Sequence, residues 1–199
     1  MAGSKPDQKK QIPVVTYFVI FILGFLTGVG FTVYKTSGTG SSAPAANNQQ
    51  STQDDETHKV MLELEAEVTA NPDNSQAWKQ LGNLYYDHNL PEKAIRAYTK
   101  TLELQPGNAN ILTDLGVMYR RVKQPEKAVE SFNKAIQIDP SHEPARFNKG
   151  IVLLYDMNKP EEAIAAWEDL LKINPQARAA GGESLQDFIN NVKAQAAGK

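Results

Sequence analysis

The sequence predicts an all-α protein: an α-solenoid of three helix pairs with flanking helices, preceded by one transmembrane helix and a flexible linker. Two observations lead to this prediction. A pattern of Gly, Ala, aromatic and Pro residues returns every 34 residues through the middle of the chain. Near the N-terminus, 21 consecutive residues carry no charge. Such a repeat is typical of helical solenoids, and such a run is typical of a membrane span.

The uncharged run occupies residues 14–34. As a helix it would be about 30 Å long, which matches the hydrocarbon core of a bilayer. Lysines cluster before it and only one follows closely, so the positive-inside rule puts residues 1–13 in the cytoplasm. We therefore expect a single-pass inner-membrane protein whose remaining residues are periplasmic. A cleaved signal peptide is the alternative, because Ala43, Pro44 and Ala45 imitate a cleavage site.

Two glycines, Gly24 and Gly28, lie within the uncharged run and are four residues apart. Small residues at that spacing let two membrane helices pack closely, which predicts a homodimer through this face. Residues 35–56 contain almost no large apolar side chain. Such a segment cannot bury enough surface to fold, so we expect a disordered linker.

The repeat region begins with half a repeat, residues 57–74, and continues with repeats 75–108, 109–142 and 143–177. The first full repeat contains Trp78, Leu81, Gly82, Tyr85, Ala94, Tyr98 and Pro106. The second contains Leu112, Leu115, Gly116, Tyr119, Ala128, Phe132 and Pro140. The third contains Gly150, Leu153, Ala163, Trp167, Leu170 and Pro175. In each repeat the pattern predicts two helices that meet at the glycine and end at the proline.

The ends of the array, residues 57–182, also follow the pattern. Pro72 lies one period before Pro106, so the half repeat supplies a single opening helix. Beyond residue 182, apolar residues at helical spacing predict a C-terminal capping helix and tail over 183–199. Ser184 and Asp187 form the expected capping box of that helix. We therefore expect eight helices after the linker.

The third repeat departs from the spacing. Its glycine, Gly150, keeps the offset of two periods from Gly82, but Pro160, in the proline–acid pair of the link, comes one residue late relative to Pro91. Two interpretations are open. Either one extra residue has entered between Gly150 and Tyr155, in which case Arg146 and Lys149 occupy usually apolar positions, or the loop near Pro144 has shifted the register, and Phe147 and Leu154 fill those positions.

Composition argues against several classes of function. Lys and Arg total 21 and Asp and Glu total 23, so no basic excess indicates a nucleic-acid partner. There are no cysteines and only three scattered histidines, which argues against a metal centre. No P-loop, GxGxxG, HExxH or GxSxG motif is present. We therefore expect no enzyme, no metal and no cofactor.

The 34-residue pattern over residues 57–177 resembles the tetratricopeptide repeat (TPR) family. That resemblance implies a protein or peptide partner in a concave groove lined by the first helix of each pair. The groove residues it implies are Lys79, Asn83, Tyr86, Asp114, Val117, Arg120, Arg121, Asn148 and Ile151. Some TPR co-chaperones clamp a peptide carboxylate; Lys79 and Asn83 match that clamp, but Asp114 would repel the carboxylate.

The resemblance and the predicted span together imply a membrane-tethered TPR adaptor that recruits or assembles proteins at the membrane. The order of anchor, linker and repeats, with an Ala-Ile-Ala-Ala-Trp-Glu segment before the last helix, is also similar to the TPR parts of bacterial haem-lyase complexes. That likeness implies a component of cytochrome c maturation that holds an apoprotein tail. A self-assembling scaffold and an organelle import receptor are the other interpretations.

Overall fold

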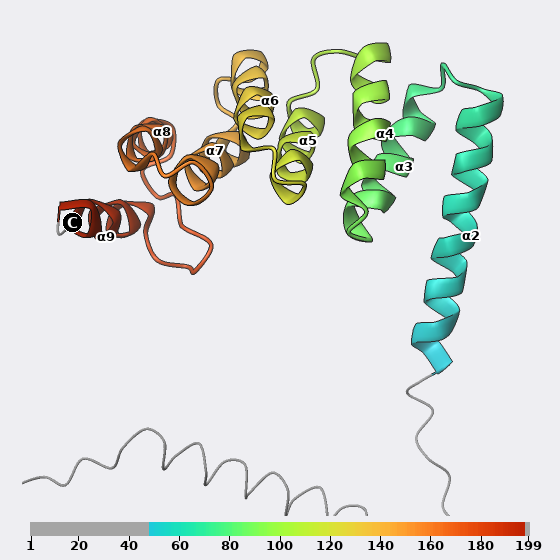
Figure 1. The fold of residues 1–199 in the computed structure, drawn as a ribbon, viewed down its shortest axis with the longest axis horizontal. Helices are drawn as coiled ribbons and strands as arrows, with labels where there is room; N and C mark the ends of the chain where they lie inside the picture. The colour runs from blue at the N-terminus through green and yellow to red at the C-terminus, as the bar shows by residue number, and fades with distance from the viewer. Residues whose placement is uncertain (1–47, 198–199) are drawn as a thin grey trace, which may run out of the picture. The chain divides into compact units, whose positions relative to one another are not determined.

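The computed structural model describes residues 48–197, and within that range the chain is all-α, with eight helices and one isolated β-bridge between Arg178 and Ser184. Figure 1 shows the helices following one another in chain order. They are α2 (Asn48–Ala70), α3 (Ser75–Asp87), α4 (Pro91–Leu104), α5 (Ala109–Arg121), α6 (Pro125–Ile138), α7 (Glu143–Tyr155), α8 (Pro160–Ile173) and α9 (Leu185–Ala197).

Local signals explain where the paired helices begin. Asn74 and Asn108 cap α3 and α5, because their side chains accept hydrogen bonds from backbone N–H groups one turn inside the helix, at 3.1 Å. The second helices α4, α6 and α8 each open with proline at the first position, where its missing N–H costs nothing. The helix starts at 75, 109 and 143 agree with the predicted repeat boundaries.

Each pair closes through contact of its glycine with the aromatic residue of the second helix. A Cβ atom added to Gly82 would lie 2.6 Å from the ring of Tyr98, and one added to Gly116 would lie 2.5 Å from Phe132. In the third pair, a Cβ on Gly150 would lie 2.2 Å from the Trp167 ring. Only hydrogen fits at these three positions, which confirms the predicted role of the glycines.

The structure decides the register of the third repeat. The first helices begin at a constant 34-residue offset, but α8 begins 35 residues after α6. The extra residue therefore lies in the turn between α7 and α8, after Tyr155, and not between Gly150 and Tyr155. Arg146 and Lys149 occupy the usually apolar positions. Arg146 donates to the Pro140 carbonyl over 2.8 Å, as the Trp78 indole N–H does to Pro72 at the same distance.

The helix pairs share one continuous core. Buried residues form three clusters, and partly buried side chains join them: Leu102, Val117 and Tyr119 pack against the first two along the chain, and Val129 and Met157 against the last two. Met61 and Val68 bring α2 into the first cluster. Every pair is thus covered on both sides by a neighbour, as the stacking of repeats requires.

The C-terminal helix begins as predicted. The Ser184 hydroxyl oxygen accepts a hydrogen bond from the Asp187 backbone N–H over 3.1 Å, and it donates to the Asp187 carboxylate over 2.6 Å. Ser184 therefore caps the helix as expected, but the Asp187 carboxylate contacts the Ser184 hydroxyl and not the backbone N–H that a full capping box would use. Leu185, Ile189 and Val192 on α9 are buried against α8 and cover the end of the array.

The first described helix corrects the expected linker. Residues 48–56 belong to α2, although the sequence predicted a disordered segment over 35–56. Residues 48–69 contain neither Gly nor Pro, so nothing stops the helix from extending upstream of its buried part. No helix in the described range is both long and apolar enough to cross a membrane. The predicted span 14–34, with Gly24 and Gly28, lies outside the described residues.

Candidate peptide-binding surfaces

Two kinds of surface arise from the way the helices stack. The first helices α3, α5 and α7 contact one another in succession, whereas the backbones of α4 and α6 do not approach each other. We call the surface of α3, α5 and α7 the inner face. Between α4 and α6 lies a cavity of about 570 Å³ whose floor is α5. We call this cavity the outer groove.

A polar cluster on the inner face contains two of the predicted residues, Asn83 and Asp114. The Tyr98 hydroxyl donates a hydrogen bond to the Asn83 side-chain oxygen over 3.0 Å. Tyr98 belongs to α4, but its ring passes over Gly82 and so delivers its hydroxyl to the α3 side. Burial, and then the charge of Asp114, raises the pKa of Tyr98. The contribution of this hydroxyl to the inner face was not predicted from the sequence.

Asp114 is half-buried, and its surroundings favour the neutral acid. Burial first, and then the nearby charge of Asp87, raises the pKa of Asp114 to about 6. A second negative charge brought to this point would meet both carboxylates. The inner face is therefore unsuited to clamping a peptide carboxylate, which agrees with the expectation that Asp114 opposes such a clamp.

The two predicted arginines join neighbouring repeats. Arg120 forms an ion pair with Asp156 at the end of α7. Arg121 lies over the ring of Tyr86, 4.7 Å from its centroid, and donates to the Tyr86 carbonyl over 3.1 Å. It also reaches the Asn89 side chain over 3.3 Å. These contacts bring Tyr86 and Arg121 together, and they show that both guanidinium groups already have partners within the fold.

The remaining four predicted residues are spread along the inner helices. Lys79 is half-buried on α3, and the Asn148 amide donates to the Pro144 carbonyl of its own helix over 2.9 Å. Val117 and Ile151 are partly buried and pack against the core clusters, so their side chains contribute mainly to stability. No group of three or more His, Cys, Asp and Glu side chains in the described part of the chain could hold a metal ion.

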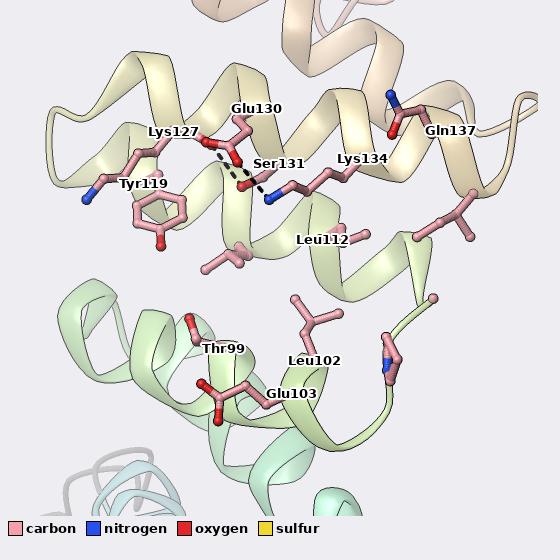
Figure 2. Close-up of a pocket in the computed structure, with 14 residues that line it drawn as sticks. Thr99, Leu102, Glu103, Leu112, Tyr119, Lys127, Glu130, Ser131, Lys134 and Gln137 are labelled. Atoms are coloured by element: carbon pink, nitrogen blue, oxygen red, sulfur yellow. Dashed lines mark hydrogen bonds and ion pairs between the residues drawn. The ribbon is translucent and has the colours of Figure 1, made fainter.

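The sequence analysis also missed the outer groove. Figure 2 shows Leu102 and Thr99 on α4 facing Lys127 and Ser131 on α6, with Tyr119 of α5 between them. The floor is apolar, because Leu112 and Leu115 are almost fully buried there. Ile138 lies at the far rim and is 45% exposed. The groove therefore combines an apolar floor with polar walls, a common composition for a ligand site.

Replacing Asp114 by Asn is expected to stabilise the fold in a pH-dependent way. The pKa of Asp114 is about 6 in the folded chain and has its ordinary value of 3.8 in the unfolded chain, so its ionisation costs stability as the pH rises between these values. Well below pH 3.8, at about pH 3, the acid is largely neutral in both states and the penalty is nearly absent. We expect Asp114→Asn to gain about 1–2 kcal/mol at neutral pH, after discounting for partial exposure.

Urea denaturation of the Asp114→Asn variant and the parent protein at about pH 3 and about pH 8 checks this expectation. The gain should appear only at the higher pH. An equal gain at both pH values would mean that charge at Asp114 is not the cause.

Comparison with known proteins identifies a family and a fold. The family described as "Cytochrome c-type biogenesis protein H TPR domain" matches residues 41–180. Among solved structures, a MamA protein is similar with TM-score 0.60 at 22% identity, over 74% of this chain and 85% of that chain. The first TPR of RPAP3 bound to the HSP90 peptide SRMEEVD matches with TM-score 0.55 at 24% identity, over 62% and 93%.

The Arabidopsis OM64 TPR domain is similar with TM-score 0.54 at 21% identity, over 61% of this chain and 95% of that chain. At these identities the solved structures establish the fold alone. No curated protein sequence matches the chain.

Proposed function

The chain belongs to the family of cytochrome c-type biogenesis protein H TPR domains, and from that membership we propose that it is a non-enzymatic adaptor that holds a segment of an apocytochrome while haem is attached elsewhere. TPR arrays are interaction domains whose repeats build extended binding surfaces. The observation that carries the proposal is the family match over residues 41–180, because similarity of fold alone would not distinguish one TPR pathway from another.

The inner face is the surface that we propose for the apocytochrome segment. Lys79 offers a donor, Asn83 offers a donor and an acceptor, and Asp114 offers an acceptor when it is ionised. An extended peptide would lie along α3 and α5, with its backbone hydrogen-bonded to these side chains. The RPAP3 domain binds the acidic peptide SRMEEVD. Because Asp114 and Asp87 lie close together here, the proposed segment carries no carboxylate at that point.

We also propose that the array is tethered to a membrane. The support is the uncharged run over residues 14–34, which has the length of a hydrocarbon core. The lysines before the run favour a cytoplasmic N-terminus and a periplasmic array. A periplasmic position suits the proposed partner, since a chain without cysteine is insensitive to an oxidising compartment.

Equilibrium binding of the full-length protein to an apocytochrome c tests the proposal. We expect the apoprotein to bind and the haem-loaded, folded cytochrome to bind much more weakly. Asn83→Ala should lower the affinity roughly fivefold, the usual effect of one lost hydrogen bond. Tyr98→Phe is the matched control, because it removes the same internal hydrogen bond and leaves Asn83 in place. Absence of binding, or equal loss in both variants, would contradict the proposal.

A further inference from the structure

The repeat symmetry of the array places two equivalent pockets on its outer side. One is the outer groove, between α4 and α6. The other lies between α2 and α4 and has a volume of about 190 Å³. Its lining residues include Val68, Trp78, Leu81, Tyr85 and Lys93, and each has a counterpart in the outer groove one period later.

The smaller pocket already holds a carboxylate, that of Glu65 on α2. The Tyr85 hydroxyl donates to Glu65 over 2.5 Å, and the Lys93 ammonium lies 3.0 Å from the same oxygen. Lys93 also lies over the Tyr85 ring, 5.1 Å from the centroid. These two hydrogen bonds, that of Tyr85 first, lower the pKa of Glu65 and keep it charged. A tyrosine and a lysine together therefore bind an anion at this repeat position.

The outer groove contains the same two groups without the anion. Tyr119 and Lys127 take the places of Tyr85 and Lys93, and the Lys127 ammonium lies 5.5 Å from the centroid of the Tyr119 ring. Thr99 takes the place of Glu65 and is too short to reach them. Within the described part of the chain, the Tyr119 hydroxyl has no hydrogen-bond partner and Lys127 has no ion pair.

The other charges of the outer groove are already paired. Lys134 forms an ion pair with Glu130 over 2.7 Å, and Lys100 with Glu103 over 3.3 Å. Lys127 is thus the lysine of the groove without a direct ion pair in the described residues, although its charge also acts on Glu130, the partner of Lys134. The next equivalent position, between α6 and α8, lacks the arrangement, because Leu153 replaces the tyrosine and Glu162 replaces the lysine.

We propose that the outer groove binds an apolar peptide segment of a partner protein through a carboxylate held by Tyr119 and Lys127. The carboxylate takes the position that Glu65 has in the neighbouring pocket, and apolar side chains next to it cover Leu102, Leu112 and Ile138. A cavity of about 570 Å³ accommodates a few side chains, not a whole helix. This inference goes beyond the proposed function, since it concerns another face and does not require an apocytochrome.

Three fluorescein-labelled peptides, titrated against the full-length protein and followed by fluorescence anisotropy, test the proposal. The first is SAVLELVAS with an amidated C-terminus, the second has Gln in place of Glu, and the third is the Gln peptide with a free C-terminus. We expect the Glu peptide to bind at least about tenfold more tightly than the amidated Gln peptide, because a charged hydrogen-bonding group is lost. Tight binding of the third peptide would assign the site to a terminal carboxylate.

Two variants, one on α6 and one on α5, locate the effect. Lys127→Gln should bring the Glu and Gln peptides close to equal affinity, and Tyr119→Phe should reduce the difference in part. Lys134→Gln is the control, since Lys134 also lines the groove but is paired with Glu130. Lys127 is exposed, so its replacement leaves the fold intact. Binding of an apocytochrome at the inner face should persist in Lys127→Gln, which keeps this test separate from that of the proposed function.

Three results would overturn the proposal. Equal affinity for all three peptides would show that the groove does not recognise a carboxylate. If Lys134→Gln and Lys127→Gln have equal effects on peptide affinity, the cause is general attraction to positive charge and not a specific site at Lys127. Self-association of the full-length protein that Lys127→Gln abolishes, seen by light scattering, would make a second copy of the chain the occupant.

Discussion

Replacing Gly116 by Leu is expected to unfold the second helix pair. Even a single Cβ atom at this position would lie 2.5 Å from the Phe132 ring, and that ring is completely buried. The ring cannot move aside, because Ala128 and Ala135 pack beside it in the same cluster. We expect a loss of about 3 kcal/mol or more, which exceeds the gain of about 1 kcal/mol from removing a helical glycine.

Thermal and urea denaturation followed by circular dichroism measure this loss. Gly181→Ala is the matched control, because nothing lies within 4 Å of the position of its Cβ. The double variant Gly116→Leu with Phe132→Ala should lose less than the sum of the single variants, since the alanine removes the atoms that clash. Unchanged helicity and melting in Gly116→Leu would contradict the packing of the repeats.

Replacing Trp167 by Ala is expected to destabilise the array and release its last helix. Trp167 is completely buried, and its indole N–H donates to the Phe147 carbonyl over 3.1 Å. Its ring meets Phe188 of α9 edge-on, with 5.0 Å between centroids. Removal of a buried tryptophan typically costs about 3–5 kcal/mol. Because α9 packs on α8 through this ring, α9 should lose protection before the rest of the array.

Hydrogen exchange of the backbone amides measures the release of α9. Trp78→Ala is the matched control, since Trp78 is the other tryptophan of the chain and is only partly buried, at the far end of the array. We expect Trp78→Ala to leave the exchange of α9 unchanged. If the amides of α9 exchange equally faster in both variants, or if neither variant changes their exchange, Trp167 does not hold this helix.

Much of the fold could be predicted because its signals are local in sequence. Gly82, Gly116 and Gly150 mark the contacts with the aromatic residues, and the prolines mark the second helices. The extra residue in the third repeat was also visible, but its position was not, because a residue inserted in the first helix and one inserted in the turn delay Pro160 equally. The start of α2 was missed, since polar residues without Gly or Pro are compatible with both helix and coil.

The candidate sites were less predictable because they depend on contacts between repeats. Arg120 and Arg121 were expected to line the groove, but their partners Asp156 and Tyr86 lie about one period away in sequence, so these contacts were not predicted. The outer groove arises from the separation of α4 and α6. The spacing of apolar residues along each helix does not reveal that separation. One signal was available: comparison of the repeats shows that Tyr119 and Lys127 match Tyr85 and Lys93, while Glu65 has no acidic counterpart.

The most direct test of the proposed function is photo-crosslinking in cells that make c-type cytochromes. A photo-reactive residue in place of Asn83, on the inner face, should form an adduct that mass spectrometry identifies as an apocytochrome. The same residue in place of Asn190, on exposed α9 surface, should form none. Absence of any cytochrome adduct from position 83, or equal adducts from both positions, would contradict the account.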